Sequence, residues 1–286
     1  MHRSTIQLLR LPFSFFLMPV YLFALSLVPD IHVVHAILTF VILHLLVYPS
    51  SNGYNSYMDR DETPIGGLSN PMQPTKELFY VSIIMDLMAI AAGLFISYWF
   101  AICIVVYIAA SRAYSYRGIR LKRYPVTGYL TVVLFQGALT FYMVYHGCSA
   151  SKTHEIPWPG VLSASLLIGG FYPLTQVYQH EADKQDGVRT ISMLLGYRGT
   201  FLFTAMVYTV AMGILAWLFI SREEAEKFFV LATMMVPILV YFFVWARKVW
   251  KDVHKADFHH AMRMNILASC CTNIAFIILL TWRWFE

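Results

Sequence analysis

The stretch from Tyr48 to Asp59 reads YPSSNGYNSYMD, and the stretch from Tyr172 to Asp183 reads YPLTQVYQHEAD. Without a gap, both copies begin with Tyr-Pro, continue with a hydroxyl–amide pair and a Tyr–amide pair, and end in Asp. Another acid, Glu62 or Asp186, follows three residues after each copy. In a membrane protein, a repeat of this kind suggests two paired halves around a shared site.

Both copies end long apolar runs in a strongly apolar chain. The residues A, V, I, L, M, F, W, Y and C make up 58% of the 286 residues, and charged residues make up 13%. In a typical soluble domain about a quarter of the residues are charged. Several runs reach the roughly 20 residues that a helix needs to cross a bilayer. The sequence therefore predicts an all-α, polytopic membrane protein.

The apolar runs predict nine transmembrane helices around a central cavity, arranged as two pseudo-repeated halves within one domain over residues 1–286. The predicted spans lie near residues 11–29, 31–50, 77–97, 98–113, 125–146, 160–178, 200–220, 226–246 and 264–283. The two copies of the repeat follow the second and the sixth span, so we expect them on the same side of the membrane.

The distribution of Lys and Arg tests this count. With nine spans, only Lys152, Arg222, Lys227 and Arg283 lie on one side, and all other Lys and Arg residues share the opposite side. The positive-inside rule makes the crowded side cytoplasmic, so we expect the N-terminus inside and the C-terminus outside, with both copies on the cytoplasmic face. This topology accounts for the net charge of +5, which therefore does not indicate nucleic-acid binding.

The four cysteines, Cys103, Cys148, Cys270 and Cys271, show no CxxC or Cys/His spacing. They predict neither a disulfide framework nor a zinc site. We expect them to be small apolar side chains within helices.

The second copy gathers its polar side chains on one face if it prolongs its helix at about 100° per residue. Gln179, Asp183, Asp186 and Thr190 then lie within a narrow arc, and Glu181 points the opposite way. This face would present one amide and two carboxylates.

The same arithmetic places Asn55, Asp59 and Glu62 on one arc of the first copy, with Asp61 away from it. Two such faces opposed make an oxygen-lined cavity with four acids. Four carboxylates cannot all stay ionised near one another without cations. Hard oxygen ligands suit Mg²⁺, which keeps several waters and is completed by substrate phosphate.

The basic segment at residues 112–123 supplies the complementary charge on the same predicted face. Arg117, Arg120, Lys122 and Arg123 offer donors suited to phosphate oxygens. An acidic metal site beside a basic loop predicts a site for a diphosphate whose tail lies in lipid. Aromatic side chains of the spans could shield a developing carbocation through their ring faces.

In layout and motifs, the chain resembles the UbiA-type intramembrane prenyltransferases, whose members have nine transmembrane helices and two Asp-rich motifs after helices two and six. The first family motif has Asp four residues after Asn, which Asn55 and Asp59 match. The family's R-P-[IL]-x-x-G stretch is similar to Pro64-Ile65 and Gly67. The second family motif, D-x-E-x-D-x-x-x-G-x-x-T, corresponds to Gln179, Glu181, Asp183, Gly187 and Thr190. Between the two motifs, the family's Y-S-x-P-P-x-R-L-K segment corresponds to Tyr114, Ser115, Arg120, Leu121 and Lys122.

The chain departs from the family pattern in both motifs. Ser56 stands where the first motif often has another Asp, and the usual last acid is missing, so Glu62, or else Asp61, would substitute. Gln179 replaces the leading Asp of the second motif, and Arg117-Gly118 replaces the Pro pair. An amide oxygen can ligate a cation but brings no charge, which lowers the expected metal affinity.

The resemblance implies Mg²⁺-dependent transfer of an isoprenoid chain from a prenyl diphosphate to an aromatic or lipidic acceptor in the membrane, with the cell inner membrane as the expected location. It implies Asp59 and Asp183 as the catalytic residues. The implied metal ligands are Asn55, Asp59, Glu62, Gln179, Asp183 and Asp186, the implied diphosphate-binding residues are Arg117, Arg120, Lys122 and Arg123, and the supporting residues are Asn52, Asp61, Gln176 and Tyr114.

Structural interpretations of the same residues stay open. Asp59 and Asp183 are alternatively solvated acids at helix ends, and the neighbouring amides cap or connect helices. The basic segment alternatively anchors the protein to anionic lipid. Asp86 lies inside the third span, where it is costly unless paired, and it serves either the structure or acceptor binding.

Two other functions stay open as well. A transporter or lipid-binding carrier of the same fold would have lost the chemistry, which the replaced acids would explain. A membrane terpene cyclase would ionise a diphosphate without transferring the chain to an acceptor. Metal-dependent bond cleavage excludes the carrier, and product masses separate the cyclase from the transferase.

Overall fold

The computed structural model describes residues 1–282, and the predicted outer-face residue Arg283 lies outside the described residues. Within that range the chain consists of helices and connecting loops, with two isolated bridges and no strand. The predicted all-α class is confirmed.

The N-terminal half contains six α-helices that are interrupted by two other helical segments. Their bounds are α1 (Arg3–Leu8), the 3₁₀ helix η1 (Leu11–Phe16), α2 (Met18–Leu27), α3 (Val33–Val41), the π-helical segment η2 (Ile42–Val47), α4 (Tyr48–Asp59), α5 (Lys76–Leu94) and α6 (Tyr98–Ser115).

The C-terminal half continues in the same way. Its elements are η3 (Leu121–Arg123), α7 (Pro125–Val132), the π-helical segment η4 (Val133–Leu139), α8 (Thr140–Cys148), α9 (Trp158–Phe171), the 3₁₀ helix η5 (Tyr172–Gln179), α10 (His180–Gln185), α11 (Ile191–Ile220), α12 (Ala225–Lys251), η6 (Val253–Lys255) and α13 (Phe258–Trp282).

The described residues contain eight helices that are long and apolar enough to cross a membrane, each formed by one element or by several consecutive ones. A ninth span results if the segments Arg3–Phe16 and Met18–Leu27, which meet at an angle of 41°, are counted together. The bend lies between η1 and α2, where Pro19, the second residue of α2, supplies no backbone donor to the preceding turn. The first span is therefore broken, whereas the sequence predicted one continuous helix there.

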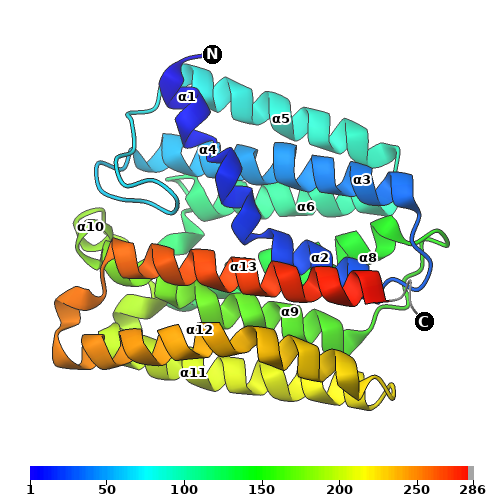
Figure 1. The fold of residues 1–286 in the computed structure, drawn as a ribbon. Coiled ribbons are helices and arrows are strands. Elements are labelled where there is room, and N and C mark those ends of the chain that lie inside the picture. The colour runs from blue at the N-terminus through cyan, green and yellow to red at the C-terminus, as the bar shows by residue number, and fades with distance from the viewer. Residues whose placement is uncertain (283–286) are drawn as a thin grey trace.

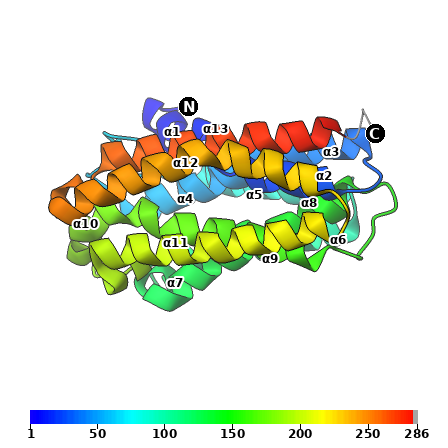
Figure 2. The ribbon, with the colours of Figure 1, turned by 60° about the horizontal axis from the view of Figure 1, so that its bottom comes forward.

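The helices run side by side along one long direction, as Figures 1 and 2 show from two sides. α4 and α10, which carry the ends of the two repeated copies, reach the same end of the bundle, at the left of Figure 1. α2 lies in the middle and contacts α8, α9 and α13. The fold therefore brings the two copies to one end of the bundle, as predicted from their positions after the second and the sixth span.

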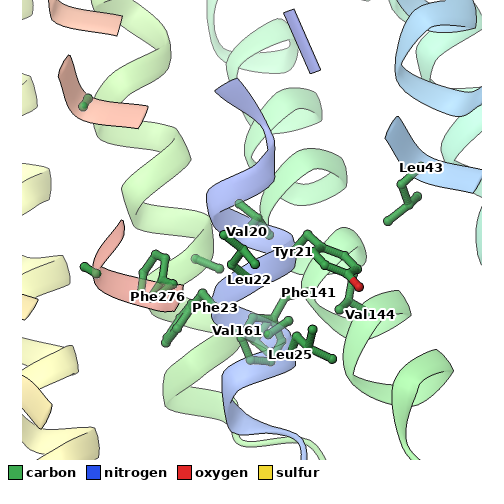
Figure 3. Packing of buried hydrophobic residues seen from close by; sticks show 14 of the residues in the cluster. Val20, Tyr21, Leu22, Phe23, Leu25, Leu43, Phe141, Val144, Val161 and Phe276 are labelled. Atoms are coloured by element: carbon green, nitrogen blue, oxygen red, sulfur yellow. The ribbon is translucent and has the colours of Figure 1, made fainter. Parts of the chain in front are cut away.

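The buried helix α2 forms the centre of the apolar core. Phe23 stacks on Phe276 of α13 with ring centroids 4.8 Å apart and meets Phe141 of α8 edge-on at 5.5 Å, as Figure 3 shows. A helix that is apolar on all sides is buried by its neighbours. Tyr21, also in this helix, donates its hydroxyl proton to the carbonyl of Ala36 at 2.8 Å, so the polar atom of this side chain is satisfied.

Both prolines of the repeat lie where the helix changes type. Pro49 follows the widened π-helical segment η2 and is the second residue of α4. Pro173 is the second residue of the 3₁₀ helix η5, which follows α9. Proline lacks an N–H and crowds the carbonyl four residues earlier, so a regular α-helix cannot continue through it without local adjustment.

The intramembrane acid Asp86 is paired with a basic residue of the neighbouring helix. Asp86 of α5 forms an ion pair with Arg112 of α6 and accepts a hydrogen bond from the hydroxyl of Ser50. The Arg112 guanidinium also lies over the ring of Tyr54, 4.0 Å from its centroid. These contacts connect α4, α5 and α6, so Asp86 has a structural partner within the bundle.

Candidate functional site

One cavity of about 180 Å³ at the end of the bundle is lined by both repeated copies. From the first copy and the loop after it, Asn55, Asp59 and Asp61 line this cavity. The second copy and its continuation contribute Gln176, Gln179, Asp183, Asp186 and Thr190. We call this space the acidic cavity. Asp59 and Asp183, from segments more than a hundred residues apart, thus face one space.

The second copy reaches the cavity through a 3₁₀ helix, whereas the sequence predicted an α-helix throughout. Side chains three residues apart eclipse one another in a 3₁₀ helix. Tyr172, Thr175 and Tyr178 accordingly lie along one face of η5, and all three line the acidic cavity. The expected grouping of Gln179, Asp183 and Asp186 is observed, and Glu181 is exposed outside it.

Asp59 is held by two cations of the basic segment. Its carboxylate forms an ion pair with Lys122, and its other oxygen lies 3.7 Å from the guanidinium of Arg120. The Asp59 side chain is 6% exposed, so these charges interact in a largely dry environment.

Asp186 is the acid that Arg120 contacts most closely. The guanidinium of Arg120 forms an ion pair with the Asp186 carboxylate and donates to the Asp186 carbonyl at 3.0 Å. Arg117 approaches the same carboxylate from the rim at 3.4 Å and donates to the carbonyl of Met58 at 2.8 Å. The basic segment therefore joins the two acidic motifs, which are far apart in sequence.

Of the two acids that the sequence offered to complete the first motif, Asp61 lines the cavity with Asp59 and Glu62 does not. α4 ends at Asp59 because Arg60 adopts a left-handed conformation with φ +53°. The helical arc on which Glu62 was placed therefore does not exist, and Glu62 is exposed. Burial, followed by the negative charge of Asp59, raises the pKa of Asp61 to about 6.

The remaining predicted residues lie at different distances from the acidic cavity. Arg123 is exposed, with its guanidinium 5.0 Å from the ring centroid of Tyr124, and does not line the cavity, because the 3₁₀ turn η3 directs it outward. Asn52 lines a neighbouring cavity. Tyr114 lines both cavities, and its hydroxyl forms a hydrogen bond with that of Tyr172.

Several cavity residues were not predicted from the sequence. Arg10, which lies between α1 and η1, lines the acidic cavity together with Phe13. Asn265 and Met262 reach it from α13. Arg10 directly precedes an apolar run, which is a weak sequence signal, and the α13 residues show no local pattern that would indicate a site.

A hard cation fits the oxygen atoms of this cavity, although no three His, Cys, Asp or Glu residues within 1–282 converge closely enough to hold one alone. Asp59 Oδ1 is buried without a hydrogen-bond partner. Asn55 and Gln179 donate their amide nitrogens to Ser115 Oγ at 3.0 Å and to the Pro64 carbonyl at 3.5 Å, which leaves the amide oxygens for a cation. Such a site needs ligand phosphate and water to complete the coordination, as is usual for Mg²⁺.

Comparison with known families gives one assignment. The profile of the UbiA prenyltransferase family matches residues 13–267. A comparison with curated proteins gives no significant match.

Solved structures with the same fold cover nearly the whole chain. A UbiA homolog from Archaeoglobus fulgidus bound to GPP and Mg²⁺ is 19% identical with a TM-score of 0.71, over 97% of this chain and 99% of that chain. The apo structure of a UbiA homolog from Aeropyrum pernix K1 is 16% identical with a TM-score of 0.71, over 94% and 98%. A structure reported for digeranylgeranylglyceryl phosphate synthase is 17% identical with a TM-score of 0.62, over 98% of both chains. At these identities the likeness shows the fold.

Proposed function

Because this chain belongs to the UbiA prenyltransferase family, we propose that it transfers an isoprenoid chain from a prenyl diphosphate to an aromatic or lipidic acceptor within the membrane, in a Mg²⁺-dependent reaction. The observation that carries the proposal is the shared cavity, into which both acidic motifs and the basic residue Lys122 project. The homolog from Archaeoglobus fulgidus, which has the same fold, was solved with GPP and Mg²⁺ bound, and this supports the same ligand class here.

The acidic cavity offers two sets of metal ligands. Asn55, Asp59 and Asp61 would hold Mg²⁺ on one side, and Gln179, Asp183 and Asp186 would hold it on the other. When bound, Mg²⁺ neutralises the diphosphate and stabilises the charge that develops on it as a leaving group. Asp61 takes the place that the sequence interpretation gave to Glu62.

The basic segment supplies fixed positive charge beside these acids. Lys122 lines the cavity with a side chain 14% exposed, and Arg120, 9% exposed, lies behind the lining residues Asp59 and Asp186, with Arg117 more exposed beside Asp186. In this position their N–H groups would bind phosphate oxygens, and charge-assisted bonds in a dry site are strong. They therefore orient the diphosphate and stabilise its departure.

The isoprenoid tail has a separate apolar space. A cavity of about 70 Å³ lies between α2, α9, α11 and α13 and shares Asn265 with the acidic cavity. Phe23, Phe171 and Phe276 line it, so it matches a hydrocarbon chain that starts at the diphosphate. The ring faces beside it are suited to shield an allylic cation.

The proposed transfer balances without a further reactant. The bond between C1 of the prenyl chain and the diphosphate oxygen breaks, and pyrophosphate leaves with the electron pair. A carbon or oxygen of the acceptor then bonds to C1, and the acceptor loses a proton to the released pyrophosphate.

The protein is an integral, multi-pass membrane protein. We place the acidic cavity on the cytoplasmic side of the cell inner membrane, with the N-terminus inside and the C-terminus outside. The excess of Lys and Arg near the cavity end of the bundle supports this orientation.

Purified protein with MgCl₂ and prenyl diphosphates of several lengths should release pyrophosphate and form a prenylated acceptor. Asp183→Asn should lower the rate on the order of a hundredfold, as expected for loss of a charge that supports the leaving group. Glu181→Gln, on the exposed side of the same helix, is the matched control. Pyrophosphate release that persists in EDTA, or that is equally fast in Asp183→Asn and Glu181→Gln, would overturn the proposal. A product with the mass of the prenyl chain alone would indicate a cyclase.

A further inference from the structure

α12 ends in a group of cations that the acidic cavity does not use. Arg247, Lys248 and Lys251 lie in the last two turns of this helix, and Arg198 of α11 reaches the same place by donating to the Trp250 carbonyl at 2.8 Å. We call these four cations the basic patch. It lies at the end of the bundle that holds α10, where α12 is orange at the left of Figures 1 and 2. None of the four cations lines the acidic cavity.

No acid of the described chain balances this charge. All four side chains are exposed, and within residues 1–282 none of them forms an ion pair with Asp or Glu. The two acids of the connection that follows α12 are used locally. Asp252 accepts a hydrogen bond from the amide of His254 at 3.0 Å, and Asp257 lies 2.9 Å from Nδ1 of His260. The basic patch therefore presents its positive charge to whatever surrounds the protein.

General effects explain only part of this arrangement. Lys248 and Lys251 lie in the last turn of α12, where the helix dipole favours cations. Arg247 and Lys251, however, are four residues apart, and like charges at this spacing destabilise a helix. Arg198 adds a third charge from another helix, and apart from its contact with the Trp250 carbonyl its guanidinium has no partner among the described residues. An anion bound between these cations would offset their mutual repulsion.

The exposed face of α12 that leads to the basic patch is apolar. Val236, Val240 and Phe243 are exposed, and at 100° per residue they lie with Arg247 within an arc of about 60°. Because α12 is long and apolar enough to span a membrane, this stripe faces lipid acyl chains. A soluble anion would use the cations alone, whereas a phospholipid places its phosphate at the cations and its acyl chains along the stripe.

We propose that the basic patch binds the headgroup of an anionic phospholipid. The phosphate lies between Arg247 and Lys251, and the Arg198 guanidinium closes the site from α11. Charge-assisted bonds from arginine to phosphate oxygens are strong, and basic clusters beside the ends of transmembrane helices bind anionic headgroups. This inference does not depend on the prenyl transfer proposed above, because the four cations lie outside the acidic cavity.

Native mass spectrometry of the purified full-length protein in a neutral detergent tests the proposal. The protein is given equimolar phosphatidylglycerol and phosphatidylcholine with identical acyl chains, so the ratio of the two retained lipids reports on the headgroup alone. We expect the wild type to retain at least about tenfold more phosphatidylglycerol than phosphatidylcholine. The double variant Arg247→Gln/Lys251→Gln should bring this ratio close to one, since each cation near an anionic surface contributes about fivefold.

Two further variants separate this site from a general effect of charge. Arg198→Gln removes the contribution of α11 and should lower the ratio about fivefold. Arg3→Gln/Lys76→Gln removes the same charge as the first double variant, from exposed residues at the start of α1 and α5, and should leave the ratio unchanged. The ratio is measured on folded, lipid-bound molecules, so a lower yield of a variant does not alter it.

Equal retention of the two lipids by the wild type overturns the proposal, as does an unchanged ratio in Arg247→Gln/Lys251→Gln. An equal loss in the Arg3→Gln/Lys76→Gln control would show that net charge alone attracts the lipid, and it would overturn the proposal as well. Glycerol phosphate, which carries the phosphate without acyl chains, should not displace phosphatidylglycerol. Displacement would assign the basic patch to a soluble phosphate and exclude the lipid.

Discussion

At the scale of single residues, Arg120 connects the two repeated copies through one guanidinium. The group lies 3.7 Å from Asp59 and pairs with Asp186, so two acids from opposite halves approach each other around one permanent cation. Arg120 has φ +50°, a conformation that is costly for a residue with a side chain. The two ion pairs offset that cost and hold the side chain between Asp59 and Asp186, two acids that line the cavity.

The pair Asp61 and Glu62 allows a direct test of which acid completes the first motif. Asp61→Asn should raise the Mg²⁺ concentration needed for half-maximal pyrophosphate release by roughly 10–100-fold, the range found when groups that support a metal site are removed. Glu62→Gln removes the same charge one residue further on, from an exposed side chain, and should leave this concentration unchanged. A larger effect of Glu62→Gln would restore the interpretation made from sequence.

These two residues also show where sequence reasoning ends. The helical arc correctly grouped Asn55 with Asp59 and Gln179 with Asp183, because the arithmetic holds within and at the start of a helix. It failed at Asp61 because a left-handed Arg60 ends the helix, and arginine carries no signal for that conformation. Arg10 was missed because its position at the cavity depends on the loop at Gly66 and on α4, which only the fold places beside it.

At the scale of elements, similar sequences fold differently in the two halves. The first copy forms the α-helix α4, and the second begins as the 3₁₀ helix η5. The positions of Pro49 and Pro173 are equivalent, so the difference comes from the segments that precede them. The first proline follows the wider π-helical segment η2, whereas at the second the α-helix α9 changes to the narrower 3₁₀ helix η5. A single sequence predicts that a helix changes at proline, but the direction of the change depends on packing against neighbouring helices.

The ion pair between Asp86 and Arg112 should stabilise the packing of α4, α5 and α6 against one another. Asp86→Asn leaves Arg112, whose side chain is 17% exposed, without its counter-charge and should destabilise the protein by at most about 3–5 kcal/mol, the loss seen when one partner of a fully buried pair is removed. Replacing both residues, Asp86→Leu with Arg112→Met, should recover most of this loss, because no unpaired charge remains. Thermal unfolding in detergent measures both variants, and a double variant less stable than Asp86→Asn would contradict this explanation.

At the scale of the whole molecule, hydropathy and charge were enough to predict the all-α bundle and the position of both motifs at one end. The spacing of apolar runs sets which loops share a side, and that information is local in the sequence. The cavities were not predictable in this way, because they arise where side chains from several helices leave space between them, as Asn265 of α13 does beside Asp183.

The orientation of the bundle in the membrane follows from the same charge distribution and gives the last prediction. Glu62 and Lys184 are exposed at the end that holds the acidic cavity, and Glu155 is exposed in the loop between α8 and α9 at the opposite end. Single cysteines at these three positions, introduced after replacement of the four native cysteines, report on the side of the membrane through an impermeant maleimide. In intact cells only Glu155→Cys should react, and in inverted inner-membrane vesicles only Glu62→Cys and Lys184→Cys should react.

Labelling of Glu62→Cys and Lys184→Cys from different sides would separate the two motifs and exclude a shared site, whereas labelling of both from outside would keep the site and reverse the topology. The first pattern is what the excess of basic residues around the acidic cavity requires, because translocating that end would carry most of the positive charge across the membrane.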